Sequence, residues 1–420
     1  MPLRRLLGLS AAVSAPLRRG FSTGASCPPW VMIGKYVRVN PPEPLPRASL
    51  RLAEPPSASH LVVHGHLIRK PRGPDPVSGD VSLLFGGFVK ATIGDGLLLL
   101  HFFDFIGSPF VVATRGGDLK NKLAGIHPDV TRAVCNPISG ELVRLPDMDG
   151  TKKTMWFTDT GILTRSERPH GRPDRYAVAD LTAVDRGGEE QSFVMRRFLS
   201  ETGKWDKLVG LPSPLPALGR RMYMNTLHEA VAFAGRLWWV DTSWGAISAD
   251  PFSDRPELRF VELPRGSVTE PVGRQRPGKE LVRYRRMGVS EGRLRYIEVS
   301  KEEPFVLSSF SLDDDCRSWT LEHRVALRRL WPHEDLCKDM PQIAVIDPLS
   351  ASIAHLTIGK QALSIDMGNG NLLGCTLRGE GDGLVPFPKP CLLPAWLASS
   401  PIPCAGDLTY HMVSLRYIHA

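Results

Sequence analysis

A spacing of 57 residues recurs in the sequence and limits the folds that the chain can adopt. Gly235 begins the segment GRLWWVDTS, and Gly292 begins the similar segment GRLRYIEVS 57 residues later. Trp205 and Trp319 each close a pair of strand-like segments joined by a polar turn, and they lie 114 residues apart, which is two such spacings. Because separate landmarks share one period, we expect the chain to consist of repeated structural units of this size.

Asx-Pro dipeptides mark turns within these units. They begin at Asn136, Asp250 and Asp347, and each stands between two apolar runs. An Asn or Asp side chain can accept a hydrogen bond from the backbone two residues further on, and the proline presets φ for a turn. Asn136 and Asp250 are again 114 residues apart. Short strands joined by turns, repeated about every 50 residues, are typical of propeller blades.

The predicted fold class is all-β: a β-propeller of six blades, with five or seven left open, preceded by a disordered targeting segment. The period gives about five blades between Gly96 and Arg378, and strands before Gly96 complete another by ring closure, which hides sheet edges. We therefore assign residues 30–385 to the propeller. Residues 386–420 are too rich in proline for central strands, and we expect them to pack on the propeller.

The first 21 residues have the composition of an organellar targeting sequence. They carry two arginine pairs and two serines, with two more serines by residue 26, and the first acidic residue of the chain is Glu43. This composition predicts a mitochondrial transit peptide at 1–21, cleaved after Phe21, with 22–29 as a linker. A plastid transit peptide, a secretory signal and an uncleaved cytosolic chain are the alternatives. The four arginines account for half of the formal net charge of +8, so the mature chain is only mildly basic.

The cysteines and the apolar runs give no sign of a disulfide framework or a membrane span. Seven cysteines are dispersed along the chain without a C-x-x-C pair, which is typical of free thiols in a reducing compartment. No apolar run approaches the roughly 18 residues of a spanning helix. We expect a monomer with no cofactor and no membrane span.

Three segments carry a resemblance to a known family: PDRYAVADL from Pro173, SFVMRRFLSETGKWDKL from Ser192 and YRRMGVSEGRLRYIEV from Tyr284. They resemble the plant family catalogued as domain of unknown function 1618, which is expanded in cereals. The resemblance implies a propeller like those of F-box-associated domains, with no established activity and no catalytic residues. We expect no F-box-like module, since the basic targeting segment takes its place.

Ser290 stands in a G-x-S-x-G pattern with Gly288 and Gly292, the spacing of a hydrolase nucleophile elbow. The elbow requires a helix after the second glycine. The residues that follow are instead β-branched and aromatic, and they align with the repeat unit at Gly235. We interpret Ser290 as part of a hairpin turn, with the pattern matched by chance.

Three histidines lie within the segment HLVVHGHL. On an extended strand, His60, His64 and His66 would share one face and could bind a metal. The alternative is that they are ordinary strand-surface histidines, since no fourth ligand follows at a suitable spacing. They are weak metal candidates.

The strongest concentration of charge lies between residues 274 and 286. Its basic residues could contact RNA or an acidic partner, while a solvated loop between blades is the simpler interpretation. The residues are Arg274, Arg276, Lys279, Arg283, Arg285 and Arg286.

The sequence therefore predicts a non-enzymatic protein-interaction module, placed in mitochondria, whose protein partner is unknown. Propellers present a broad loop face suited to recognition. An organellar RNA-associated factor that uses the basic 274–286 loop is one alternative. A hydrolase or a metal-dependent enzyme with its site in the channel is the other.

Overall fold

The computed structural model describes most of the predicted propeller. The transit peptide predicted at 1–21 and the first part of the linker lie outside the described residues, as do Arg274 and Arg276. The described residues are 27–39, 46–68, 81–107, 129–152, 159–168, 171–184, 192–215, 229–269, 278–331, 339–377 and 387–404.

The described chain is built of mainly antiparallel sheets, four of which have four strands each in chain order. The first contains β9 (Gly161–Arg165), β10 (Arg175–Val184), β11 (Ser192–Leu199) and β12 (Lys204–Pro212). The second contains β13 (Ala230–Phe233), β14 (Arg236–Asp241), β15 (Gly245–Ala249) and β16 (Arg259–Glu262). The third contains β17 (Arg285–Ser290), β18 (Arg293–Val299), β19 (Val306–Leu312) and β20 (Trp319–Ala326). The fourth contains β21 (Gln342–Ile346), β22 (Ile353–Ile358), β23 (Gln361–Asp366) and β24 (Asn371–Leu377).

Two further sheets complete the described fold, and the smaller one pairs the N-terminal strand with the C-terminal one. The seven-stranded sheet has the order β3 (Ser49–Arg51), β4 (His60–Val63), β2 (Tyr36–Val39), β5 (Val81–Thr92), β6 (Leu98–Gly107), β7 (Asp129–Cys135) and β8 (Leu142–Arg144). The two-stranded sheet pairs β1 (Trp30–Ile33) with β25 (Lys389–Leu392). The helices in the described ranges are short, namely α3 (Gly278–Leu281), α4 (Trp396–Ser399) and the 3₁₀ turns η1 (Gly65–Leu67), η2 (Met148–Gly150) and η3 (Leu327–Leu330).

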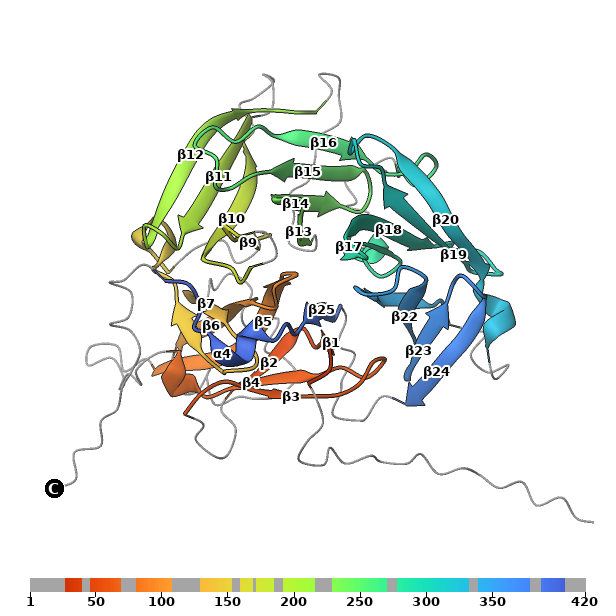
Figure 1. The fold of residues 1–420 in the computed structure, drawn as a ribbon, viewed down its shortest axis with the longest axis horizontal. Helices are drawn as coiled ribbons and strands as arrows, with labels where there is room; N and C mark the ends of the chain where they lie inside the picture. Colours follow the sequence, from red (N-terminus) through yellow and green to blue (C-terminus); the bar gives the residue numbers. More distant parts are fainter. Residues whose placement is uncertain are drawn as a thin grey trace, which may run out of the picture.

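The sheets follow one another around a ring (Figure 1). Their inner strands β5, β9, β13, β17, β21 and β25 each contact the next, and β25 contacts β5 again. The prediction of an all-β propeller is therefore confirmed. The number of six blades stays a prediction, because the β1–β25 sheet has two strands and not the four of a regular blade.

The ring closes through strands from both ends of the chain. Cys391 lies opposite Val31 in the β1–β25 pair, and Ile33 forms a parallel bridge to Ser59 beside β4. The Pro-rich segment after residue 385 thus supplies the inner strand β25, which is an edge strand and not a central strand of its sheet. Pro390 is tolerated because β25 pairs on one side only, and an edge strand can accept a residue without an N–H group.

The 57-residue period corresponds to the step from one sheet to the next. Gly235 lies in the turn between β13 and β14, and Gly292 in the turn between β17 and β18, with φ of 69° and 71°. The preceding residues, Ala234 and Glu291, both have φ of 49°. Two consecutive residues with positive φ are typical of a type I′ hairpin turn, so the turn predicted around Ser290 is confirmed.

The two tryptophans at twice that spacing lie on the outer strands of alternate sheets. The Trp205 Nε1–H on β12 donates a hydrogen bond to the carbonyl of Pro146 at 2.8 Å, and that of Trp319 on β20 to the carbonyl of Glu262 at 2.7 Å. Each indole thus ties its sheet to the end of the preceding one. This equivalence explains why a tryptophan recurs at this position.

The Asx-Pro turns form as predicted, but not all at equivalent positions. Asn136 Oδ1 accepts the N–H of Ile138 at 3.0 Å, and Asp347 Oδ1 accepts that of Leu349 at 2.8 Å. The turns at Asn136 and Asp250 precede the last strand of their sheets, β8 and β16, whereas the turn at Asp347 follows the first strand, β21. The third dipeptide is therefore a similar local turn outside the repeat.

Burial is greatest in the middle strands of a sheet, since the inner strand β13 is only half-buried. Every residue of β15 is buried, whereas β12 alternates between exposed and half-buried positions. Neighbouring sheets pack closely, since a Cβ atom added at Gly161 would lie 2.9 Å from the Cβ atom of Ala230. The core is accordingly a series of apolar layers between sheets, and the inner strands meet at the centre of the ring.

Candidate functional site

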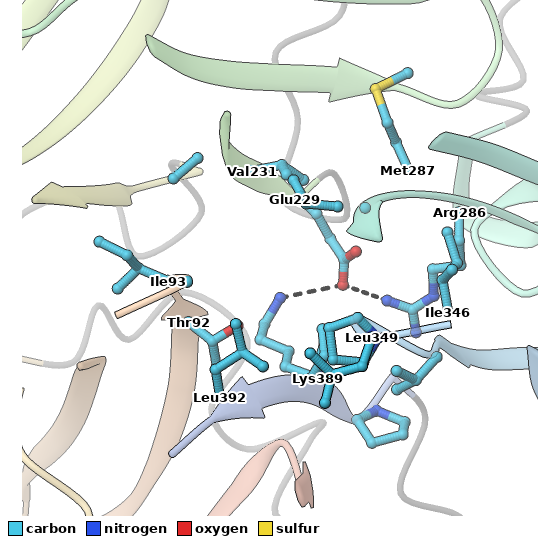
Figure 2. Close-up of a pocket in the computed structure, with 18 of the residues that line it drawn as sticks. Thr92, Ile93, Glu229, Val231, Arg286, Met287, Ile346, Leu349, Lys389 and Leu392 are labelled. Atoms are coloured by element: carbon cyan, nitrogen blue, oxygen red, sulfur yellow. Dashed lines mark hydrogen bonds and ion pairs between the residues drawn. The ribbon is translucent and has the colours of Figure 1, made fainter. Parts of the chain in front are cut away.

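A pocket of about 390 Å³ lies where five inner strands converge. Its walls are mostly apolar, and the labelled side chains in Figure 2 come from β5, β13, β17, β21 and β25 or from residues just beyond their ends. The apolar contributors include Ile93, Val231, Met287, Ile346 and Leu392. A cavity of this size, with an apolar lining and few polar groups, has the character of a small-ligand site.

Three charged side chains meet in this pocket (Figure 2). Glu229 Oε1 accepts hydrogen bonds from Arg286 Nη1 and from Lys389 Nζ, the latter at 3.1 Å. The three side chains are only 23%, 7% and 11% exposed, respectively. Charges at this depth are stable only when they are paired and hydrogen-bonded, so Glu229 compensates two cations at once.

The pairing controls the ionisation of Glu229. Burial by itself would raise its pKa, but the charges of Arg286 and Lys389 and their hydrogen bonds outweigh this effect and lower the pKa to about 2. Burial lowers the pKa of Lys389, which the charge of Glu229 partly offsets. Glu229 is therefore a carboxylate at neutral pH and faces two positive groups.

A third cation stands beside this cluster. Lys35 Nζ lies 5.4 Å from the ring centre of Phe387, whose ring also faces the guanidinium of Arg286 at 4.9 Å. Burial, with the neighbouring charges of Lys389 and Lys90, lowers the pKa of Lys35 to about 8. The centre of the ring therefore carries more positive than negative charge close to the pocket.

Arg286 has hydrogen-bonding capacity that the described part of the protein leaves unused. Its Nη1 binds Glu229, but its Nε and Nη2 are buried and have no hydrogen-bond partner among the described residues. An arginine keeps its charge in proteins, and all five of its N–H groups are donors. The unused pair is the most distinctive chemical feature of the pocket.

Strand geometry separates the two adjacent arginines of β17. Neighbouring side chains on a strand point to opposite faces. Arg286 reaches the pocket, whereas Arg285 donates to the carbonyl of Thr242 at 2.9 Å and pairs with Glu298 at 3.6 Å. The adjacent residues Arg285 and Arg286 therefore lie in two different environments, and only Arg286 faces the pocket.

The basic residues from 274 to 286 do not form one surface in the described structure. Arg274 and Arg276 lie outside the described residues, and Lys279 lies in α3. Arg283 is exposed, Arg285 is half-buried and Arg286 is buried. The expectation of a six-residue contact surface is therefore corrected for Arg285 and Arg286, since both are engaged inside the protein.

The three histidines are only partly brought together. His64 precedes η1 and His66 lies within it, with their Nδ1 atoms 2.5 Å apart, whereas His60 begins β4. Burial and the neighbouring His64 lower the pKa of His66. Among the residues that the structure describes, no group of three or more His, Cys, Asp or Glu side chains is placed to hold a metal ion.

Ser290 lies at the end of β17, with a strand after the turn and not a helix. Its side chain is fully buried, and its hydroxyl donates to the carbonyl of Asp347 at 2.6 Å. In the repeat it corresponds to Phe233, the last residue of β13. The geometry is that of a structural hydrogen bond between sheets and lacks the strand-to-helix turn of a nucleophile elbow.

The sequence patterns predicted no role for Glu229 or Lys389, and they placed Arg286 on a surface loop. A weak signal exists for Lys389, because it is the only charged residue between Val385 and Leu393 in an otherwise apolar and Pro-rich run. A lone charge in such a run indicates either an exposed position or a paired buried one. Sequence alone cannot name the partner, which lies 160 positions away.

No helix among the described segments is long and apolar enough to span a membrane. No curated protein matches the chain by sequence.

Solved structures with a likeness to this chain are distant. A chain of the structure titled "Crystal Structure of Mitotic Checkpoint Complex" is 10% identical with a TM-score of 0.30, and the alignment covers 59% of each chain. The Cps50 (Swd1) beta-propeller domain of Myceliophteria thermophila is 11% identical over 74% of this chain and 87% of that one, with a TM-score of 0.27. Apo AztD from Citrobacter koseri is 8% identical over 70% and 71%, with a TM-score of 0.26.

The family assignment rests on the middle of the chain. The matched region runs from β14 through β22 and includes the hairpin at Gly292. Residues 239–359 match the model of the family described as Protein of unknown function (DUF1618), which confirms over this segment the family resemblance seen in the sequence.

Proposed function

We propose that the chain is a non-enzymatic module that binds a protein partner at the mouth of the central pocket. The observation that carries this proposal is the gathering of hairpin turns at one end of the pocket. Its lining includes Gly94 after β5, Gly292 after β17 and Leu349 after β21. Leu349 is 49% exposed there, and exposed apolar side chains on ordered loops are common contact points for partners.

Proximity labelling in the native plant cell tests this proposal. Leu349→Asp places a charge at the mouth and should remove the direct partner from the labelled set. Leu377→Asp is the matched control, because Leu377 is 77% exposed on the outer strand β24, away from the mouth. The proposal fails if both variants label the same neighbours as the unchanged protein.

We propose mitochondria as the site of action. The support is the composition of residues 1–21, with two arginine pairs and no acidic residue. Residues 1–29 fused to a fluorescent protein should co-localise with a mitochondrial marker. Replacement of Arg4, Arg5, Arg18 and Arg19 by Gln should abolish that localisation. A plastid or cytosolic signal from the unchanged fusion would contradict the assignment.

The two alternative functions have less support from the described residues. Arg285 and Arg286 make internal contacts, so an RNA contact would have to use other basic residues. A serine hydrolase would need a reactive Ser290. A serine-reactive probe should label the native chain and Ser290→Ala equally, and stronger labelling of the native chain would overturn the non-enzymatic assignment.

A further inference from the structure

The unused donors of Arg286 have a geometry that fits a two-oxygen anion. Nε and Nη2 form one edge of the planar guanidinium, from which two N–H bonds point in parallel. Glu229 occupies the other nitrogen, Nη1, so a second acceptor on this edge would satisfy the two buried donors that have no partner among the described residues. The Arg286 side chain is 7% exposed and lines the pocket. Leaving two such donors without an acceptor in a buried site is costly.

The charge balance favours a single negative charge on that acceptor. Arg286 and Lys389 carry two positive charges, and Glu229 is the acid that pairs with both. Lys35 adds a further cation, although its lowered pKa of about 8 leaves it partly neutral near physiological pH. One added anion would neutralise the excess carried by the pocket triad.

The rest of the lining distinguishes a carboxylate from a phosphate. A phosphate has further oxygens that would need donors, whereas the walls beyond the triad are supplied mainly by apolar residues such as Val231, Ile346 and Leu349. A carboxylate uses both its oxygens on one arginine edge. Its attached carbon chain would then pack against these apolar walls.

We propose that the central pocket binds a small organic monocarboxylate, with the carboxylate on the Nε and Nη2 edge of Arg286 and its apolar chain along β13, β17 and β21. The cavity of about 390 Å³ limits the ligand to a small molecule. The site does not depend on the partner proposed for the pocket mouth. A neutral molecule of the same shape should bind this site more weakly, because it lacks the charge that pairs with Arg286.

Titration calorimetry of the full chain with butanoate, hexanoate and octanoate at neutral pH tests the site. Affinity should rise about fourfold per added methylene, which corresponds to about 0.8 kcal/mol, until the pocket is full. The matching primary amides should bind at least tenfold more weakly. Absence of binding by all three acids, equal binding by the amides, or tighter binding of inorganic phosphate would overturn the proposal.

Two variants test the arginine edge and the apolar space of the site separately. Arg286→Lys keeps the charge but removes the parallel donors, and it should weaken hexanoate at least tenfold. Arg283→Lys, at an exposed position just before β17, is the matched control and should bind hexanoate as the unchanged chain does. Wild-type affinity in Arg286→Lys would refute the role of the arginine edge.

A second variant keeps every charge and changes only the space. Gly288 lines the pocket, and a Cβ atom there would lie 3.5 Å from Ile346 Cδ1, an ordinary contact. Gly288→Val should therefore fold, which thermal unfolding can verify, and should weaken octanoate more than butanoate. An equal affinity for octanoate before and after this change would place the ligand elsewhere and refute the site.

Discussion

Replacing Glu229 by Gln should lower the free energy of unfolding by about 3 kcal/mol at pH 7. The estimate comes from the pKa of Glu229, which the charges of Arg286 and Lys389 lower from 4.5 to about 2 against the effect of burial. Each pKa unit corresponds to about 1.4 kcal/mol. The glutamine keeps the shape but leaves two cations in a pocket where their side chains are 7% and 11% exposed.

The same residue predicts how the difference depends on pH. The folded protein holds the proton of Glu229 more weakly than the unfolded chain, so the carboxylate stabilises the fold fully above about pH 4.5. That contribution is lost as the pH falls towards 2. The difference between the native chain and Glu229→Gln should therefore shrink across this window.

Urea unfolding followed by tryptophan fluorescence at several pH values measures this difference. Glu257→Gln is the matched control, because the Glu257 side chain is 66% exposed in its pair with Arg259. This control should leave the unfolding midpoint unchanged. A loss below 1 kcal/mol at pH 7 in Glu229→Gln, or a difference independent of pH, would refute the view that this carboxylate compensates the buried cations.

Two further predictions concern turns that hold the sheets. Gly292→Val should lower the free energy of unfolding by roughly 1–2 kcal/mol, because its φ of 71° is strained for any L-residue. Gly288→Ala is the comparison: the φ of Gly288 lies outside that range, so this variant should lower the free energy of unfolding less in the same urea titration. Asn136→Ala should lower the free energy of unfolding by about 3 kcal/mol. The buried amide of Asn136 accepts hydrogen bonds from two backbone N–H groups and donates one to the carbonyl of Leu397 at 2.8 Å. It should also speed proteolysis near α4. Asp366→Ala, an exposed turn of the same kind, should leave that cleavage rate unchanged, and equal effects at both sites would contradict the role of the Leu397 contact.

The repeat is the part of the fold that could be predicted from the sequence. The residues that favour a turn are close together in the sequence, so Gly235 and Gly292 indicated hairpins without any knowledge of where their sheets lie in the ring. Their equal spacing then indicated that neighbouring sheets are built alike. Trp205 and Trp319 recur because both reach the end of the preceding sheet. The Asx-Pro turn at Asp347 is the exception, since the same local chemistry serves a different connection there.

The closure of the ring was harder to predict because it depends on an unusual strand. Proline normally argues against a central strand, and the segment around Pro390 therefore gave no strand signal. The segment pairs with β1 on one side only, so the missing N–H group is tolerated. Nothing in the local sequence records that its partner begins at Trp30.

The sequence by itself determined the strands, the turns and the period, because these depend on residues a few positions apart. Only the tertiary structure decided that Arg286 enters the ring centre while Arg285 turns away, and that Glu229 and Lys389 meet it there. These three charged residues come from different inner strands or their ends, and closing the ring brings them together. Burial then makes their pairing obligatory, because charges removed from water must be compensated.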